Sequence, residues 1–149
     1  MKEKVYLDFS KILLPDVNDV ETSPFWEGTR QGKIRFPKCK NCHQFQWYPC
    51  VLCPNCHSSN IEWQTITSMP RLYSWTCVRR PLGPHFAIWG PYIVAYVEFD
   101  EAPDLRLVSN LVDCRPEEVY IGMPLEAAFQ HINDEVTIPL FKPMKEPVS

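Results

Sequence analysis

Residues 39–57, CKNCHQFQWYPCVLCPNCH, contain two C-x-x-C pairs, Cys39–Cys42 and Cys53–Cys56, which are separated by ten residues. A two-residue gap lets both sulfurs of a pair point at one ion, and ten residues suffice for a hairpin that returns the second pair to the first. Four thiolates are the ligand set of a structural zinc site, because they leave no position for water or substrate. The spacing therefore predicts a zinc ribbon held by Cys39, Cys42, Cys53 and Cys56. The same ligands suit iron, so the sequence leaves the choice between zinc and iron open.

The same segment admits other interpretations. His43 and His57 follow the two pairs, as in the c-type haem attachment motif. Two attachment sites this close leave little room for two porphyrins, so we place these histidines in the turn after each cysteine pair. Cys50 forms a second formal pair with Cys53, but the Cys-Pro-x-Cys turn favours pairing Cys53 with Cys56. Asn41 and Asn55 are expected at left-handed turn positions, which Asn tolerates better than most residues.

Composition sets the class of protein. The chain has 149 residues, of which 45% are hydrophobic and 22% charged, enough to bury the core of one domain or two small ones. The formal net charge of -3 argues against general nucleic-acid binding, which depends on neutralising phosphates. The charged first residues, MKEKVYLDFSK, give no apolar signal-peptide core, and no apolar run is long enough to cross a bilayer. We therefore expect a cytoplasmic protein without a membrane contact, whose thiols stay reduced.

The segments on either side of the cysteines predict a mainly β protein. Before them, Ser23 as N-cap and Pro24 as first helical residue favour a short helix that runs to about Gln31 and closes at Gly32. After them, five strands are expected, with one helical turn from Pro116 between the third and the fourth, which is the pattern of a closed OB-fold barrel. The expected strands begin at Met69 and then span 91–99, 105–112, 124–131 and 136–141, with turns at 100–104 and at 133–134. The predicted division is 1–36 for an N-terminal helical and extended arm, 37–67 for the ribbon, 68–143 for the barrel and 144–149 for a flexible tail.

Several local motifs occur in an order that resembles one known family. They are Phe25-Trp26, the two cysteine pairs, Tyr48-Pro49, LYSWT at 72–76, PYIVAYV at 91–97 and PEEVYIGMP at 116–124. Over roughly residues 22–143 the chain resembles the rubredoxin-like zinc ribbon plus OB-fold family, the domain of unknown function thirty-five, which is described as acyl-CoA-associated. It departs from the family pattern at His43 and His57, where glycine is common, and at Cys50, where an arginine often follows the proline. Any contact with an acyl-CoA through that arginine is therefore in doubt.

The resemblance implies a function without catalytic residues of its own. Members of the family resemble scaffold subunits that bridge thiolase-fold or ketoacyl-synthase-like catalytic subunits, with acyl-CoA at a shared interface. The two-part architecture is most similar to the branch that serves C-acylation, such as phloroglucinol acetylation in a three-component acetyltransferase. An accessory partner of a steroid side-chain aldolase or of hydroxymethylglutaryl-CoA synthase is the alternative within the family.

Two further hypotheses belong to other classes of protein. Zinc ribbons and OB barrels also bind single-stranded nucleic acids, and base stacking would fall to aromatic side chains of the barrel strands, namely Tyr73, Trp75, Tyr92 and Tyr96. Acyl transfer by a cysteine would need Cys77 or Cys114 beside a base, either His85 or His131. We expect these two cysteines to be buried structural residues instead. Aromatic residues in predicted loops indicate a protein partner, and they are Trp26, Trp47, Tyr48, Trp63, Phe86, Trp89 and Tyr92.

Overall fold

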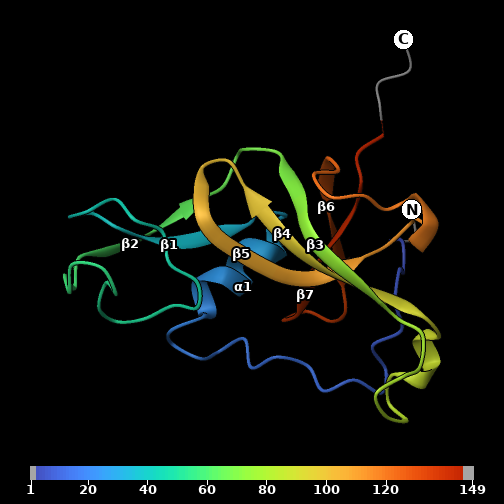
Figure 1. Cartoon of the computed structure of the whole chain (residues 1–149). Coiled ribbons are helices and arrows are strands. Elements are labelled where there is room, and N and C mark those ends of the chain that lie inside the picture. Colours follow the sequence, from blue (N-terminus) through green and yellow to red (C-terminus); the bar gives the residue numbers. More distant parts are fainter. Residues whose placement is uncertain (1–2, 146–149) are drawn as a thin grey trace.

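The computed structural model describes residues 3–145, and these form one α-helix and two sheets. Figure 1 shows a two-stranded sheet, the ribbon, projecting from a curled five-stranded sheet, the barrel. The ribbon consists of β1 (Arg35–Cys39) and β2 (Ile61–Thr65), paired antiparallel, and helix α1 (Ser23–Arg30) precedes it. The barrel strands are β3 (Pro70–Val78), β4 (Tyr92–Phe99), β5 (Ala102–Leu111), β6 (Leu125–His131) and β7 (Thr137–Pro143), in the order β3-β4-β5-β7-β6. The mainly β prediction with a four-cysteine ribbon and an OB-fold is confirmed.

Helix α1 begins one residue earlier than predicted. The backbone N–H groups of Phe25 and Trp26 donate to the carbonyl of Thr22, so Thr22 is the N-cap and Ser23 is already helical. Pro24 remains in the first turn, where its missing N–H costs nothing. The helix ends as expected, because Gly32 follows it in a left-handed conformation with φ of 71°.

The barrel has the predicted succession of elements along the chain. The 3₁₀ turn η2 (Pro116–Glu118) lies between β5 and β6, the third and fourth barrel strands, and a second 3₁₀ turn, η1 (Ala87–Trp89), precedes β4. The edge strand β3 meets the residues just before β6 through an isolated bridge, Arg71 with Pro124. Beside it, the Leu72 N–H donates to the Met123 carbonyl at 3.0 Å, and the Gly122 N–H donates to the Leu72 carbonyl at 2.7 Å. The barrel thus closes over one short stretch rather than along a continuous ladder.

One turn is shorter than predicted. Residues 100–104 were expected to form it, but Ala102 is buried and pairs with Phe99, so β5 starts there. The carboxylate of Glu101 then accepts hydrogen bonds from the backbone N–H groups of Thr67 and Ser68. A tight β4–β5 hairpin therefore anchors the connection between the ribbon and the barrel.

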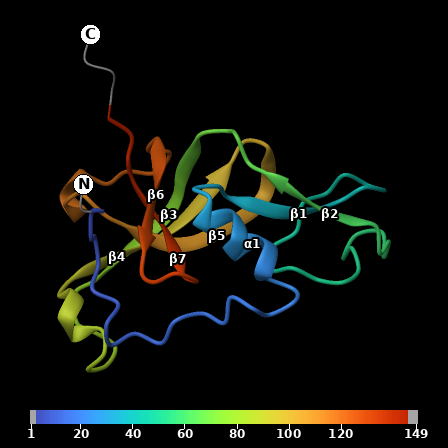
Figure 2. The same cartoon turned by 180° about the vertical axis from the view of Figure 1, so that it is seen from behind.

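An aromatic cluster joins the ribbon to the barrel core. Phe36 of β1 has no exposed surface, and its ring centre lies 5.3 Å from those of Trp47 and of Phe99 in β4. The ring of Phe25 in α1 lies 6.3 Å away. Edge-to-face contacts at such distances are favourable beyond simple burial. Phe36 therefore fixes the ribbon against the barrel, and Figure 2 shows α1 alongside both sheets.

The segment before α1 runs along the outside of the barrel in Figures 1 and 2. The buried side chain of Gln130 accepts hydrogen bonds from the N–H groups of Tyr6 and Leu7 at 2.8 and 3.0 Å, and donates to the Leu7 carbonyl at 2.6 Å. The indole N–H of Trp89 donates to the Asp8 carbonyl at 2.6 Å. These bonds replace the partners that an extended backbone would otherwise find in water.

Two sequence-based expectations concern the ends and membranes. Residues 146–149 of the predicted flexible tail lie outside the described residues. Within residues 3–145, no helix has the length and apolar character that crossing a bilayer requires.

Candidate metal centre

The sulfur atoms of the two predicted cysteine pairs converge on one point. The ligand atoms of Cys39, Cys42, Cys53 and Cys56 all lie within 4.8 Å of one another. The closest approaches join the two pairs, with Cys39 to Cys56 and Cys42 to Cys53 both at 3.6 Å between sulfurs. A tetrahedral centre with Zn–S bonds of about 2.3 Å requires sulfurs about 3.8 Å apart. This four-cysteine cluster therefore fits a structural zinc ion.

Each cysteine pair is shaped by the same backbone hydrogen bonds. In the first pair, the His43 N–H donates to the Cys39 carbonyl at 2.9 Å, and in the second the His57 N–H donates to the Cys53 carbonyl at 2.9 Å. Both histidines adopt left-handed backbone conformations, with φ of 65° and 61°. The prediction that they occupy the turn after each pair is confirmed. Their exposed rings lie outside the four-sulfur cluster.

The expectation for the two asparagines is wrong. The left-handed positions belong to His43 and His57, whereas neither Asn41 nor Asn55 has a positive φ. The amide of Asn41 instead donates to the sulfur of Cys56 at 3.4 Å. A hydrogen bond from Asn55 is the main reason that the pKa of the Cys42 thiol falls to about 6, and the bond from Asn41 is the main reason that the pKa of Cys56 is lowered. The repeated C-x-N-C pattern was the signal in the sequence.

Cys50 lies outside the cluster. Its side chain is exposed, and its sulfur lies 3.7 Å from the Tyr48 carbonyl. The register that pairs Cys53 with Cys56 is the one that brings four sulfurs together. Convergence on a single point suits one metal ion and not two separate haem attachment sites.

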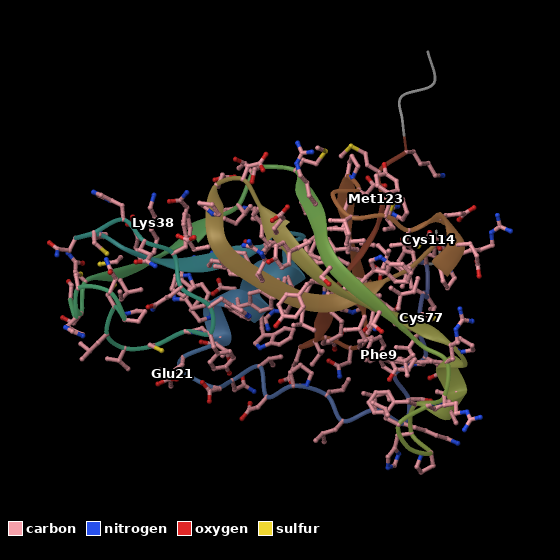
Figure 3. All side chains as sticks on the ribbon, viewed as in Figure 1. Phe9, Glu21, Lys38, Cys77, Cys114 and Met123 are labelled. Atoms are coloured by element: carbon pink, nitrogen blue, oxygen red, sulfur yellow. The ribbon has the colours of Figure 1, made fainter. Side chains whose placement is uncertain are left out.

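The other two cysteines lack the partner that acyl transfer needs. Figure 3 places Cys77 and Cys114 at the end of the barrel far from Lys38 of the ribbon. Among residues 3–145, no hydrogen bond joins either thiol to a histidine, and the ring of His131 contacts the hydroxyl of Thr137 at 3.3 Å. Burial, with the nearby carboxylates of Glu118 and Asp113, raises the pKa of Cys114 to about 11. A thiol with this pKa is protonated at neutral pH and is a weak nucleophile.

Exposed apolar side chains gather on the loop between the cysteine pairs. Tyr48, Val51 and Leu52 are 62%, 69% and 51% exposed. This loop also borders a groove of about 450 Å³, whose lining includes Trp47 and Tyr48 of the loop and Tyr96 of β4. An apolar patch with aromatic members is typical of protein interaction sites.

The other aromatic residues that were expected to contact a protein partner instead pack within the chain itself. Trp26, Trp47 and Trp63 are partly buried against the core. Phe86, Trp89 and Tyr92 pack on one another, with the rings of Trp89 and Tyr92 5.2 Å apart. Of the four side chains proposed to stack bases, Tyr73 and Tyr96 are exposed and Trp75 and Tyr92 are half-buried. The guanidinium of Arg106 lies 4.2 Å from the ring centre of Tyr73 and occupies one face of that ring.

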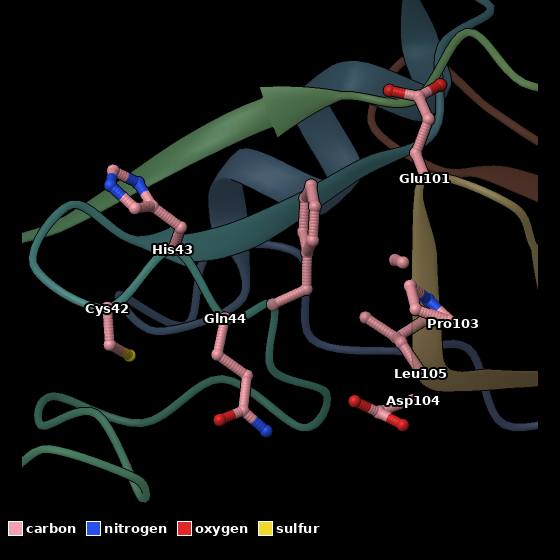
Figure 4. A pocket seen from close by; sticks show the side chains of 9 residues that line it. Cys42, His43, Gln44, Glu101, Pro103, Asp104 and Leu105 are labelled. Carbon is pink, nitrogen blue, oxygen red and sulfur yellow. The ribbon is translucent and has the colours of Figure 1, made fainter.

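A smaller hollow of about 280 Å³ borders the metal centre itself. Figure 4 shows Cys42 and His43 on its ribbon side and Glu101 and Asp104 on its barrel side. Cys42 and Cys56 are the two half-buried cysteines of the cluster, while Cys39 and Cys53 are buried. The cluster has a protected side and an accessible side.

The fold and the cluster together define a protein class, a rubredoxin-like zinc ribbon joined to an OB-fold barrel. Two family models match in this order: "ChsH2, rubredoxin-like zinc ribbon domain" over residues 26–62 and "ChsH2, C-terminal OB-fold domain" over residues 63–130. A "DUF35 domain-containing scaffold protein" of Pyrococcus furiosus is 33% identical over 117 residues, 77% of this chain and 82% of that protein. The chain belongs to this DUF35 family, whose members combine a rubredoxin-like zinc ribbon with an OB-fold domain.

Two further similarities link the family to named complexes or enzymes. A chain of a solved structure described as "Ltp2-ChsH2(DUF35) aldolase" is 30% identical, with a TM-score of 0.74 over 87% of this chain and 98% of that one. A "Probable enoyl-CoA hydratase alpha subunit" of Thermomonospora curvata is 34% identical over 122 residues, 80% of this chain. The aligned part is only 36% of that hydratase subunit's length, so the subunit contains much that has no counterpart here.

Proposed function

We propose that this chain is a non-catalytic scaffold subunit of a complex that acts on acyl-CoA substrates, and that it binds catalytic subunits of the thiolase-fold or ketoacyl-synthase-like type. The observation that carries the proposal is the similarity to a chain in a structure described as an Ltp2-ChsH2(DUF35) aldolase, which covers 87% of this chain and 98% of that one. The relatives from Pyrococcus furiosus and Methanocaldococcus jannaschii are both called DUF35 domain-containing scaffold proteins, and these names support the same role. No nucleic acid has a part in this proposal.

Within this class, we propose a thiolase-type acyltransferase complex that performs C-acylation, such as phloroglucinol acetylation or a related acyl-CoA condensation. The second candidate is a steroid side-chain aldolase, and the similarity to the Ltp2-ChsH2 aldolase chain favours it directly. A hydroxymethylglutaryl-CoA synthase complex stays a prediction from the family resemblance. The two leading candidates differ in reaction, because the first forms a carbon–carbon bond to an acyl group and the second cleaves one.

For the metal centre, we propose that Cys39, Cys42, Cys53 and Cys56 are the zinc ligands and that zinc stabilises the ribbon rather than reacting with substrate. The mutual sulfur distances support this assignment. Four protein ligands leave no open coordination position, which a catalytic zinc would need. The arm, ribbon and barrel boundaries at 36, 67 and 143 and a cytoplasmic location are part of the same proposal. None of the seven cysteines forms a disulfide, which suits a reducing compartment.

The docking surface that we assign to the scaffold role is the exposed loop formed by Tyr48, Val51 and Leu52. This loop is held at both ends: Cys53 belongs to the four-cysteine cluster, and Trp47 packs on Phe36 in the aromatic cluster that joins ribbon and barrel, called the aromatic junction below. The loop is therefore presented on a rigid support. A preorganised apolar surface loses little conformational entropy on binding, so more of the burial contributes to affinity.

The test is purification of a tagged chain from its native host, followed by assays of the eluate for acyl transfer and for aldol cleavage. We expect a stoichiometric catalytic subunit to elute with the wild type. The double variant Tyr48→Ser with Leu52→Ser should lose that subunit and keep its zinc. A matched control, Leu82→Ser, removes a side chain that is 80% exposed in the β3–β4 connection and should leave binding unchanged. Elution of the wild type as a monomer without either activity would refute the scaffold role.

A further inference from the structure

We propose that Asn41 and Asn55 are positioning residues that retain the metal, by donating amide hydrogen bonds across the cluster to the sulfurs of Cys56 and Cys42. This inference rests on the proposed assignment of the four cysteines as zinc ligands. It concerns how tightly the ion is held, and it is independent of which catalytic subunit the chain binds.

The contacts cross from each cysteine pair to the other. Asn41 lies in the first pair, and its amide reaches the sulfur of Cys56 in the second at 3.4 Å. Asn55 holds the matching place in the second pair, and a hydrogen bond from its side chain is the main cause of the lowered pKa of the Cys42 thiol in the first. The sequence repeats the same pattern, C-x-N-C-H, at 39–43 and at 53–57. The repeated pattern thus places an asparagine at the same position in each pair, and the contact of Asn41 shows how such an amide reaches the opposite pair.

The two sulfurs that receive these bonds are the accessible ones. Cys39 and Cys53 are buried, whereas Cys42 and Cys56 are half-buried. Water or a competing chelator therefore reaches the ion from the side of Cys42 and Cys56. Four thiolates around Zn²⁺ carry excess negative charge, and N–H donors spread that charge and hold each sulfur in place. The two amides therefore strengthen the side of the cluster that is open to attack.

A purely conformational role does not explain the asparagines. Asn is favoured where a backbone must be left-handed, but in each pair that position is taken by the histidine that follows. Lys40 and Pro54 precede the two asparagines, so the other x position of each pair differs in type. What the two asparagines share is an effect on a sulfur of the opposite pair: Asn41 donates to the sulfur of Cys56, and a side-chain hydrogen bond from Asn55 lowers the pKa of Cys42.

The experiment measures zinc release from the full chain to the chelator 4-(2-pyridylazo)resorcinol. Asn41→Leu and Asn55→Leu remove each donor without adding charge. Because partners of metal ligands are worth about 10–100-fold in metal affinity, we expect release about 10-fold faster in each single variant and about 100-fold faster in the double variant. The control is Asn60→Leu, because Asn60 lies in the same ribbon and makes its hydrogen bonds through its backbone. It should release zinc at the wild-type rate.

A spectroscopic measurement separates hydrogen bonding from general loosening of the ribbon. With Co²⁺ in place of zinc, loss of an N–H donor makes the sulfur more electron-rich, so the sulfur-to-cobalt charge-transfer bands of the Asn41 and Asn55 variants should move to lower energy. The bands of Asn60→Leu should not move. If a leucine variant fails to fold, Asn41→Ser and Asn55→Ser are measured in the same way.

Unchanged release rates would overturn the inference, and so would faster release without a band shift. Failure of the wild type to bind stoichiometric metal would overturn the ligand assignment beneath it. Normal behaviour of the metal in a chain that captures no catalytic subunit would instead refute the scaffold role alone.

Discussion

Replacement of Phe36 by alanine should weaken the whole protein, because this ring connects the ribbon to the barrel. Phe36 is fully buried, and it contacts Trp47 on the ribbon side and Phe99 on the barrel side at 5.3 Å between ring centres. Loss of a buried phenyl ring removes about 2–3 kcal/mol of transfer free energy, and the cavity left behind brings the cost to about 3–5 kcal/mol. A domain of this size has about 5–15 kcal/mol of stability in total, so the loss is a large fraction.

Urea denaturation of the zinc-loaded protein measures this loss. Fluorescence is a direct reporter, because the indole of Trp47 packs on the ring that is removed. Zinc must be held at one free concentration, since an ion that binds only the folded state adds to its apparent stability. The matched control is Tyr120→Ala, which deletes an aromatic ring that is 57% exposed and should cost within about 0.5 kcal/mol.

The outcome for Phe36→Ala decides whether the ribbon and the barrel form one cooperative unit. We expect a single transition with a lower midpoint. A free energy of unfolding reduced by less than about 1 kcal/mol, or a loss equal to that of Tyr120→Ala, would show that the aromatic junction does not fix the ribbon against the barrel.

Three other predictions test separate parts of the molecule. Cys53→Ser should abolish stoichiometric zinc in elemental analysis and unfold the ribbon, because a closed site cannot spare a ligand; full zinc occupancy would contradict this. Burial raises the pKa of Glu101, but hydrogen bonds from Ser68 and Thr67 outweigh it and hold that pKa below its usual value. The stability that ionised Glu101 contributes is therefore present above its unfolded pKa of about 4.3 and is lost as the pH falls below that value. In urea titrations, Glu101→Gln should cost about 1 kcal/mol at pH 7, after allowance for solvent screening, and almost nothing near pH 3. A difference in stability that does not depend on pH would refute this. In timed alkylation of the zinc-loaded protein, exposed Cys50 should react well before Cys114, whose pKa is raised to about 11; equal rates would count against the burial of Cys114.

The elements that the sequence predicted well are those with local signals. The C-x-x-C spacing constrains four sulfurs within a short loop, and period-two alternation in PYIVAYV directs Ile93, Ala95 and Val97 into the core. Pro116 is a local signal of the same kind: its fixed φ suits a first helical position, and it correctly predicted the helical turn η2. Element boundaries were less certain: Thr22 replaced Ser23 as N-cap because backbone bonding began one residue earlier.

The four-cysteine ribbon and the succession of strands along the chain were determined by the sequence alone, because each depends on spacing and periodicity within a short stretch. The family resemblance also came from the sequence, through the order of its motifs over residues 22–143. The aromatic junction at Phe36, the single bridge that closes the barrel and the amide of Asn41 on the sulfur of Cys56 were decided only by the tertiary structure. Each of these contacts joins residues that are distant along the chain or lie on opposite cysteine pairs. Their partners are fixed by how the sheets and loops pack in three dimensions, and no local pattern of residues specifies that packing.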